Sequence, residues 1–184
     1  MTGAGERVHL ASPDIDLDTH VMDVINTLEY EDLSDVLLFG HSYGGLVVGT
    51  ASHRTPERIG HQIYLDALVP EDGKTANQLY ESNGQHEFVE RVIRIVEEEG
   101  EGWYWPPPPP DAPSLRVTDP ADQAWMAGKL TPHPMGTPNT VIRLGNPVAE
   151  RIPRTFIPCP PYPPGGLIPH FAEQAREDPS WNYY

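Results

Sequence analysis

A serine lies between closely spaced glycines in the segment from Gly40 to Gly45, which reads Gly-His-Ser-Tyr-Gly-Gly. This is the G-x-S-x-G pattern of a nucleophile elbow, a tight turn that joins a strand to a helix. The residues two before and two after the serine must be small, because the turn is tight. Such a turn would lift the Ser42 hydroxyl above the end of a sheet and make the Tyr43 N–H a donor to an oxyanion. The pattern therefore predicts acyl-transfer chemistry with Ser42 as the nucleophile.

The segments on either side of the pattern have the character that the turn requires. An apolar run from Val36 to Phe39 ends at Gly40 and predicts a strand buried on both faces, as in a parallel sheet. Small and apolar residues from Gly44 to His53 predict a helix, and Gln62 to Leu65 begin a second buried strand. Strand, helix and strand at this spacing form a βαβ unit. These flanking elements favour a true elbow over a chance match to the five-residue pattern.

Further elements surround this unit. Asp16 to Leu28 predict an amphipathic helix whose first turn carries acidic residues, which suits the positive end of the helix dipole. The run of five prolines from Pro106 to Pro110 is a polyproline II segment, interpreted as a stiff connector in preference to a ligand for an SH3-type domain. The remaining predicted elements are a helical stripe from Phe88 to Val96, a helix near 120–129, a strand from Arg154 to Ile157, a helix from Ile168 to Arg176 and a strand beginning at Trp181.

Composition excludes several classes of function. The chain has 184 residues with 12 basic and 27 acidic side chains, a formal net charge of −15, which argues against a nucleic-acid or membrane-surface partner. No apolar run approaches the roughly 20 residues that span a bilayer. The single Cys159 excludes an internal disulfide framework and any multi-cysteine zinc site. No apolar leader follows Met1, so we expect a cytoplasmic protein. The sequence implies no metal or cofactor.

Several segments together resemble a known family. They are Thr2 to Arg7, Asp16 to His20, Asp35 to Gly45, Tyr64 to Pro70 and Arg154 to Ile157. The chain resembles the α/β-hydrolases, in the branch that includes plant-type methylesterases, hydroxynitrile lyases and their bacterial esterase relatives. The resemblance implies a mostly parallel sheet flanked by helices, with residues 1–70 and 154–184 as a partial hydrolase core. Residues 71–153 are then a helical, proline-rich cap inserted into it.

The resemblance also implies a catalytic triad and an oxyanion hole. Ser42 is then the nucleophile, and the Tyr43 N–H is one oxyanion donor. The fold can place the triad acid after either of two strands. No carboxylate follows the strand at Arg154 to Ile157, whereas Asp66 ends an earlier strand among apolar neighbours, where an unpaired Asp is costly. We therefore assign the acid to Asp66; the alternative is an Asp that only caps the turn before the cap segment.

Parts of the family's site are expected to be missing from this chain. The first strands, the loop with the second oxyanion donor and the histidine after the eighth strand have no counterpart, so the chain looks truncated at both ends. His170, near the correct end of the sheet, is a weak candidate for a substitute base. Without a base, a serine hydroxyl is a poor nucleophile.

Three functional hypotheses follow. The first is a serine carboxylesterase for small esters, with Trp103, Tyr104, Trp105 and Trp125 of the cap supplying an apolar pocket. The second, of another class, is a catalytically impaired remnant or an interaction module, whose exposed sheet edges would favour homo-oligomers. The third is a hydroxynitrile lyase, which uses the same triad.

Overall fold

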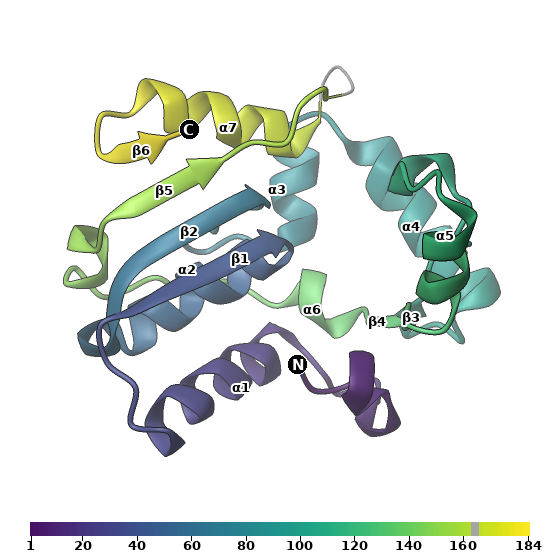
Figure 1. The fold of residues 1–184 in the computed structure, drawn as a ribbon, viewed down its shortest axis with the longest axis horizontal. Helices are drawn as coiled ribbons and strands as arrows, with labels where there is room; N and C mark the ends of the chain where they lie inside the picture. Colours follow the sequence, from purple (N-terminus) through teal and green to yellow (C-terminus); the bar gives the residue numbers. More distant parts are fainter. Residues whose placement is uncertain (163–165) are drawn as a thin grey trace.

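A computed structural model describes residues 1–162 and 166–184, with the elements arranged as in Figure 1. The helices are α1 (Leu17–Tyr30), α2 (Gly44–Arg54), α3 (Ala76–Ser82), α4 (His86–Glu99), α5 (Pro120–Ala127), α6 (Gly136–Asn139) and α7 (Leu167–Glu177). The strands are β1 (Val36–Ser42), β2 (Ile59–Ala67), β3 (Tyr104–Trp105), β4 (His133–Pro134), β5 (Arg154–Ile157) and β6 (Trp181–Tyr183). Short 3₁₀ helices cover Gly5–Leu10, Pro56–Arg58, Pro113–Leu115 and Ala149–Arg151. In the described part of the chain, none of the helices has both the length and the apolar character needed to cross a bilayer.

The candidate site lies where the strands of the main sheet end at their carboxyl termini. Its strand order is β1-β2-β5-β6, and each neighbouring pair is parallel. Ser42 at the end of β1 is in register with Ala67 of β2, and Leu65 of β2 is in register with Ile157 of β5. The carboxyl ends of these three strands therefore meet at the same edge, and the mainly parallel sheet flanked by helices is confirmed.

A single large apolar cluster fixes the helices against this sheet. Tyr64 of β2 and Phe156 of β5 are buried in it together with Leu46 of α2 and Phe171 of α7. The helix α1 joins the cluster through a face that repeats every three to four residues, as its amphipathic sequence predicts. That face consists of Leu17, Val21 and Ile25. The α2 side of the junction between β1 and α2, where Ser42 lies, is thus packed into the core.

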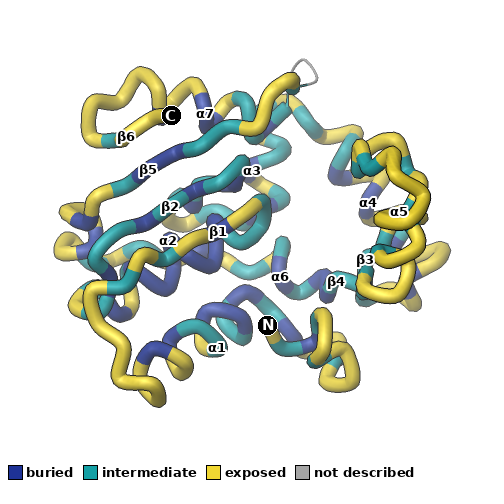
Figure 2. The backbone as a smooth tube through the Cα atoms, viewed as in Figure 1, coloured by how far each residue is buried: buried dark blue, intermediate teal, exposed yellow. Residues whose placement is uncertain are grey.

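The prediction that β1 is buried on both faces is wrong. Leu37 and Phe39 are 69% and 53% exposed, and β1 in Figure 2 consists mostly of exposed and half-buried positions. Leu38, which points to the other face, packs into the core. In the part of the chain that the structure describes, β1 is an edge strand, and no apolar cluster includes Leu37 or Phe39.

Residues 71–153 contain α3 to α6 and the short antiparallel ribbon formed by β3 and β4. Figure 1 shows α4 and α5 set apart from the sheet, with α3 and α6 lying between them and the core. A small cluster of buried residues joins α4 to the loop that follows β4, and Phe88 and Trp105 pack against it. Its buried members are Val92, Val96 and Met135. The assignment of this segment as a cap remains a prediction.

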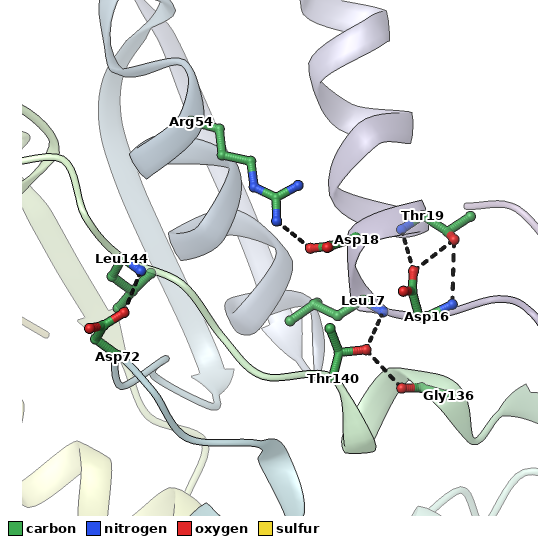
Figure 3. A network of polar contacts seen from close by, with 9 residues as sticks. All are labelled: Asp16, Leu17, Asp18, Thr19, Arg54, Asp72, Gly136, Thr140 and Leu144. Atoms are coloured by element: carbon green, nitrogen blue, oxygen red, sulfur yellow. Dashed lines mark hydrogen bonds and ion pairs between the residues drawn. The ribbon is translucent and has the colours of Figure 1, made fainter.

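Polar contacts tie this segment to the start of α1 (Figure 3). Asp16 caps α1 by accepting a hydrogen bond from the Thr19 N–H at 2.8 Å. The Leu17 N–H donates to the Thr140 hydroxyl at 3.1 Å, and that hydroxyl donates to the Gly136 carbonyl at 2.8 Å. Because the first amides of a helix have no partner inside it, these contacts satisfy groups that would otherwise lack a bond.

Candidate active site

Ser42 adopts the left-handed backbone conformation that a nucleophile elbow requires. Ser42 is the last residue of β1 and has a φ of +53°. The next residue, Tyr43, is the N-cap of α2. A non-glycine residue in this region is strained, and such strain persists where the surrounding structure enforces it. Two glycines enforce it here. A Cβ on Gly40 would lie 2.5 Å from the Gly44 carbonyl oxygen, and one on Gly45 would lie 2.1 Å from the Leu68 carbonyl oxygen.

Gly44 behaves differently from its neighbours. A Cβ on Gly44 would meet no other atom within 4 Å. The expectation that small residues are needed two before and two after the serine is therefore met sterically at Gly40 but not at Gly44. The second close approach is at Gly45, where α2 passes the end of β2.

Tyr43 is the N-cap residue of α2 and carries its side chain into a buried polar cluster. Its hydroxyl donates to Nδ1 of His20 at 3.0 Å, because Nε2 of His20 must donate to the Thr2 carbonyl at 2.9 Å. Burial raises the pKa of the Tyr43 hydroxyl and lowers the pKa of His20, so both groups are neutral near pH 7. The Tyr43 N–H itself lies at the start of α2, where amides have no partner within the helix and can face an anion.

Asp66 lies at the same edge of the sheet as Ser42. It is the next-to-last residue of β2, in the left-handed region with a φ of +44°, and it precedes Ala67, the partner of Ser42. Its Oδ1 accepts hydrogen bonds from the Cys159 N–H at 3.0 Å and from the Tyr162 hydroxyl. Burial and then the Asp66 carboxylate raise the pKa of Tyr162, which keeps this hydroxyl protonated as a donor.

A cavity of about 600 Å³ opens in front of this edge. Its wall includes Asp66, His41, Tyr80, Phe88 and Tyr162. Both donors to Asp66 occupy the same oxygen, and among the described residues none donates to Oδ2. The second oxygen therefore remains available to accept an N–H from an imidazole.

A smaller and more apolar cavity of about 80 Å³ lies on the other side of Tyr43, under α4 and β3. Tyr43, Tyr80, Phe88 and Trp105 form its aromatic walls, together with His133. The expected aromatic pocket is thus built from one of the four predicted residues, Trp105. The prediction for Trp125 is wrong, because its side chain is 67% exposed on α5.

The structure brings Ser42, Tyr43 and Asp66 together and leaves His170 apart. His170 is an exposed residue within α7, with its ring against Phe171. Among the described residues that line the cavity at Asp66, Ile168 and Pro169 are present and His170 is not. In the same described ranges, no group of three His, Cys, Asp or Glu side chains is placed to hold a metal ion.

Sequence reasoning missed several residues of the site. His20 lies three residues after Leu17 and one before Val21, so its place on the buried face of α1 was readable from the helical period. Tyr162 lies in an irregular, proline-rich segment and His133 in the two-residue strand β4, where no spacing signals that a side chain returns to the site.

Comparison with known proteins now fixes the family. The sequence profile of the alpha/beta hydrolase family matches residues 2–182. The chain belongs to this family. A carbendazim hydrolyzing esterase from Nocardioides sp. (strain SG-4G) is 47% identical to this α/β-hydrolase over 72 residues, which are 39% of this chain and 30% of that protein. The matched region is thus less than a third of that relative's length.

Solved structures show the same fold at low identity. An extracellular alpha/beta-hydrolase from Paenibacillus species superposes with a TM-score of 0.76 at 19% identity, covering 99% of this chain and 74% of that one. The methylesterase protein MES16 from Arabidopsis superposes with a TM-score of 0.56 at 23% identity, covering 85% of this chain and 62% of that one. The proteins similar to this α/β-hydrolase thus include an esterase and a methylesterase.

Proposed function

We propose that this α/β-hydrolase chain carries the acyl-transfer site of a serine carboxylesterase that acts on small esters. Ser42 is the nucleophile, Asp66 is the triad acid, and the Tyr43 N–H is an oxyanion donor. The observation that carries the proposal is the strained left-handed conformation of Ser42 between β1 and α2. A strained residue on a sharp strand-to-helix turn is a recognised feature of such nucleophiles. Esterase-type neighbours in the family support the same reaction class.

The reaction proceeds by covalent catalysis. The Ser42 oxygen attacks the ester carbonyl carbon, and the hydroxyl proton passes to an imidazole base. Negative charge on the carbonyl oxygen is stabilised by the Tyr43 N–H. Collapse of the intermediate breaks the carbon–oxygen bond, and the departing alkoxide takes the proton from the imidazolium. Water then gives a proton to the imidazole and attacks the acyl carbon, and collapse of this second intermediate releases the carboxylic acid while the Ser42 oxygen takes the proton back.

Asp66 would orient the imidazole and stabilise its charged form. The free Oδ2 accepts the imidazole N–H, while the Cys159 N–H and the Tyr162 hydroxyl hold Oδ1. Among the described histidines, none makes a hydrogen bond to Ser42 or to Asp66. The proposal therefore predicts that added imidazole can serve as the base for this chain.

Covalent labelling of Ser42 tests the proposal directly. The full chain is treated with a fluorophosphonate, with and without imidazole, and the modified peptide is identified by mass spectrometry. We expect labelling at Ser42, accelerated by imidazole, and none in Ser42→Ala. Asp66→Asn should remove most of the imidazole acceleration while the uncatalysed labelling persists. Equal labelling of Ser42 and of surface serines, with no effect of imidazole, would contradict the proposal.

Ester turnover provides a second measurement. Without imidazole we expect little or no hydrolysis of p-nitrophenyl acetate that depends on Ser42, because loss of a triad base typically removes on the order of 10⁶ in turnover. A fast rate that collapses in Ser42→Ala would show that a residue of this chain already supplies the base. His170→Ala would then be the first variant to test.

The exposed strand β1 supports a second function, self-association. β1 lies at the edge of the described sheet, and its own residues Leu37 and Phe39 are exposed. An exposed apolar edge strand can pair with the same strand of a second copy. Analytical ultracentrifugation over a concentration series would reveal such a dimer, and a monomer at all concentrations would exclude it.

A further inference from the structure

The backbone N–H of Tyr43, the oxyanion donor of the proposed reaction, belongs to the peptide that joins Ser42 to Tyr43. Its direction therefore changes with the position of the Tyr43 Cα, where φ is −52° and ψ is −32°. The Leu46 N–H donates to the Tyr43 carbonyl at 3.0 Å. The next residue adds no packing, because a Cβ on Gly44 would meet no other atom within 4 Å. The second anchor of this residue is therefore its own side chain.

The Tyr43 side chain is held at its ring and at its hydroxyl. The ring packs edge-to-face against His133, with centroids 4.9 Å apart, and against His20 at 5.8 Å. The hydroxyl donates to Nδ1 of His20 at 3.0 Å, and the Thr137 hydroxyl faces it as well. That Thr137 hydroxyl already contacts Nε2 of His133 and the Pro134 carbonyl. His20 is therefore the acceptor on which the buried Tyr43 proton depends.

His20 is fixed in one orientation through its other ring nitrogen. The residue is 1% exposed on the buried face of α1, and its Nε2 donates to the Thr2 carbonyl at 2.9 Å. The Thr2 N–H and hydroxyl donate to the two oxygens of the Asp23 carboxylate, the hydroxyl at 2.9 Å. The Arg7 guanidinium donates to the same carboxylate at 3.2 Å. The His20 ring therefore cannot turn without breaking its bond to Thr2.

These bonds form a directed chain that runs from the elbow to a charge. Each donor points away from the elbow, and the acceptors in order are His20, Thr2 and the Asp23 carboxylate. In a low-dielectric interior such a chain polarises along its length, so each bond strengthens the next. Its first link is the Tyr43 hydroxyl, so the network acts on the elbow as well as on the packing of α1.

We infer that His20 is a positioning residue of the acyl-transfer site, which holds the Tyr43 side chain by its hydroxyl and so keeps the Tyr43 N–H directed at the oxyanion. The inference rests on the proposed function and deepens it, because it names what orients the oxyanion donor. His20 acts through Tyr43 and does not touch the substrate. Among the described residues that line the cavities at Tyr43 and at Asp66, His20 is not present.

The kinetics of Ser42 labelling test this inference. The full chain reacts with a fluorophosphonate in the presence of imidazole, and the limiting rate at saturating reagent is compared for wild type, His20→Leu and the control His9→Leu, at an exposed histidine. We expect a fall of about 10- to 100-fold in His20→Leu, because loss or misplacement of an oxyanion donor typically costs on the order of 10²–10³. The reagent concentration that gives half the limiting rate should not change. Circular dichroism confirms that the protein is folded, so reduced stability alone does not lower the rate.

Two amide substitutions separate the two bonds of the His20 ring. The amide of Asn is bonded at the same position as Nδ1 of histidine, whereas the amide of Gln lies one carbon further out, near Nε2. His20→Asn can therefore accept from the Tyr43 hydroxyl, and His20→Gln can donate to the Thr2 carbonyl. We expect His20→Asn to retain more of the limiting rate than His20→Gln. In Tyr43→Phe the hydroxyl is absent, so adding His20→Leu should cause little further loss.

Nuclear magnetic resonance tests the network without any reaction. In protein with ¹⁵N-labelled histidine, the Nδ1 resonance of His20 should shift in Tyr43→Phe. An unchanged limiting rate in folded His20→Leu, equal rates in His20→Asn and His20→Gln, or an unshifted Nδ1 resonance would overturn the inference and leave the proposed function intact. If His20→Leu does not fold, the two amide variants and the resonance decide. Absence of Ser42 labelling in the wild-type chain with imidazole would contradict the proposed function, and the inference would fail with it.

Discussion

The Tyr162 hydroxyl donates a hydrogen bond to the Asp66 carboxylate, and so joins the loop after β5 to the end of β2. The Cys159 N–H binds the same oxygen. Two residues of this loop, 93 and 96 residues from Asp66 in the chain, therefore determine how its carboxylate is oriented. The proposed acid is held from the β5 side of the sheet, and Asp66 also lines the cavity of about 600 Å³.

Removal of the Tyr162 hydroxyl should weaken this link. In Tyr162→Phe, Asp66 loses one of two donors to Oδ1, and we expect the free energy of unfolding to fall by about 1–2 kcal/mol. Urea denaturation followed by circular dichroism measures the change. Tyr183→Phe, at a more exposed tyrosine in β6, is the matched control and should stay within about 0.5 kcal/mol of wild type. Equal effects of the two substitutions would show that the Tyr162 bond adds no stability.

The elbow glycines should respond unequally to alanine. Gly40→Ala places a Cβ against the Gly44 backbone, which cannot move without distorting the turn, so we expect a loss of about 2–4 kcal/mol of stability and of Ser42 labelling. Gly44→Ala meets open space in the first turn of α2 and should be neutral or stabilising by up to about 1 kcal/mol. Thermal unfolding and fluorophosphonate labelling report the two effects. Similar behaviour of both variants would argue against a close approach at Gly40.

Stability should depend on pH through His133 and His20. Burial lowers the pKa of both groups below the ordinary 6.5, to about 4 for His133, so the unfolded chain binds protons more readily than the folded one. Their contribution is fully present above pH 6.5 and is lost as the pH falls from 6.5 toward 4, by about 3 kcal/mol for His133. Urea titrations at several pH values should show this decline, with a shallower slope in His133→Gln. The lowered pKa of Asp23 acts in a separate window, below its ordinary 3.8.

The exposed face of β1 should control self-association. If β1 pairs with a second copy, Leu37→Lys together with Phe39→Lys should shift the population toward monomer, because charge on an edge strand opposes pairing. Sedimentation at matched concentrations measures the shift. Substitution of Tyr30, a highly exposed residue of α1, by Lys is the control. A dimer that survives the β1 changes would have to use another surface.

Local patterns in the sequence predicted most of the elements, because the βαβ unit around Ser42 is short and its period is clear. The burial of Leu37 and Phe39 was predicted wrongly, since a continuous apolar run is the same in a central and in an edge strand. The partners of Asp66 were not predictable, because Tyr162 reaches it through a proline-rich loop without periodicity. The position of His133 beside Tyr43 likewise depends on long-range packing.

The strand order has a consequence for how the chain folds during synthesis. β2 ends at Ala67, and β5, its neighbour on the side away from β1, begins only at Arg154, 87 residues later. Because synthesis adds about 5–20 residues per second, the edge of β2 that pairs with β5 stays unpaired for roughly 4–17 s. The unit from β1 to β2 can form early, but its second edge stays unpaired through the synthesis of the whole intervening segment. The pairing of β2 with β5 is non-local and therefore slow to form. We therefore expect the yield of folded protein to rise when the unpaired edge of β2 is shielded from other chains during synthesis.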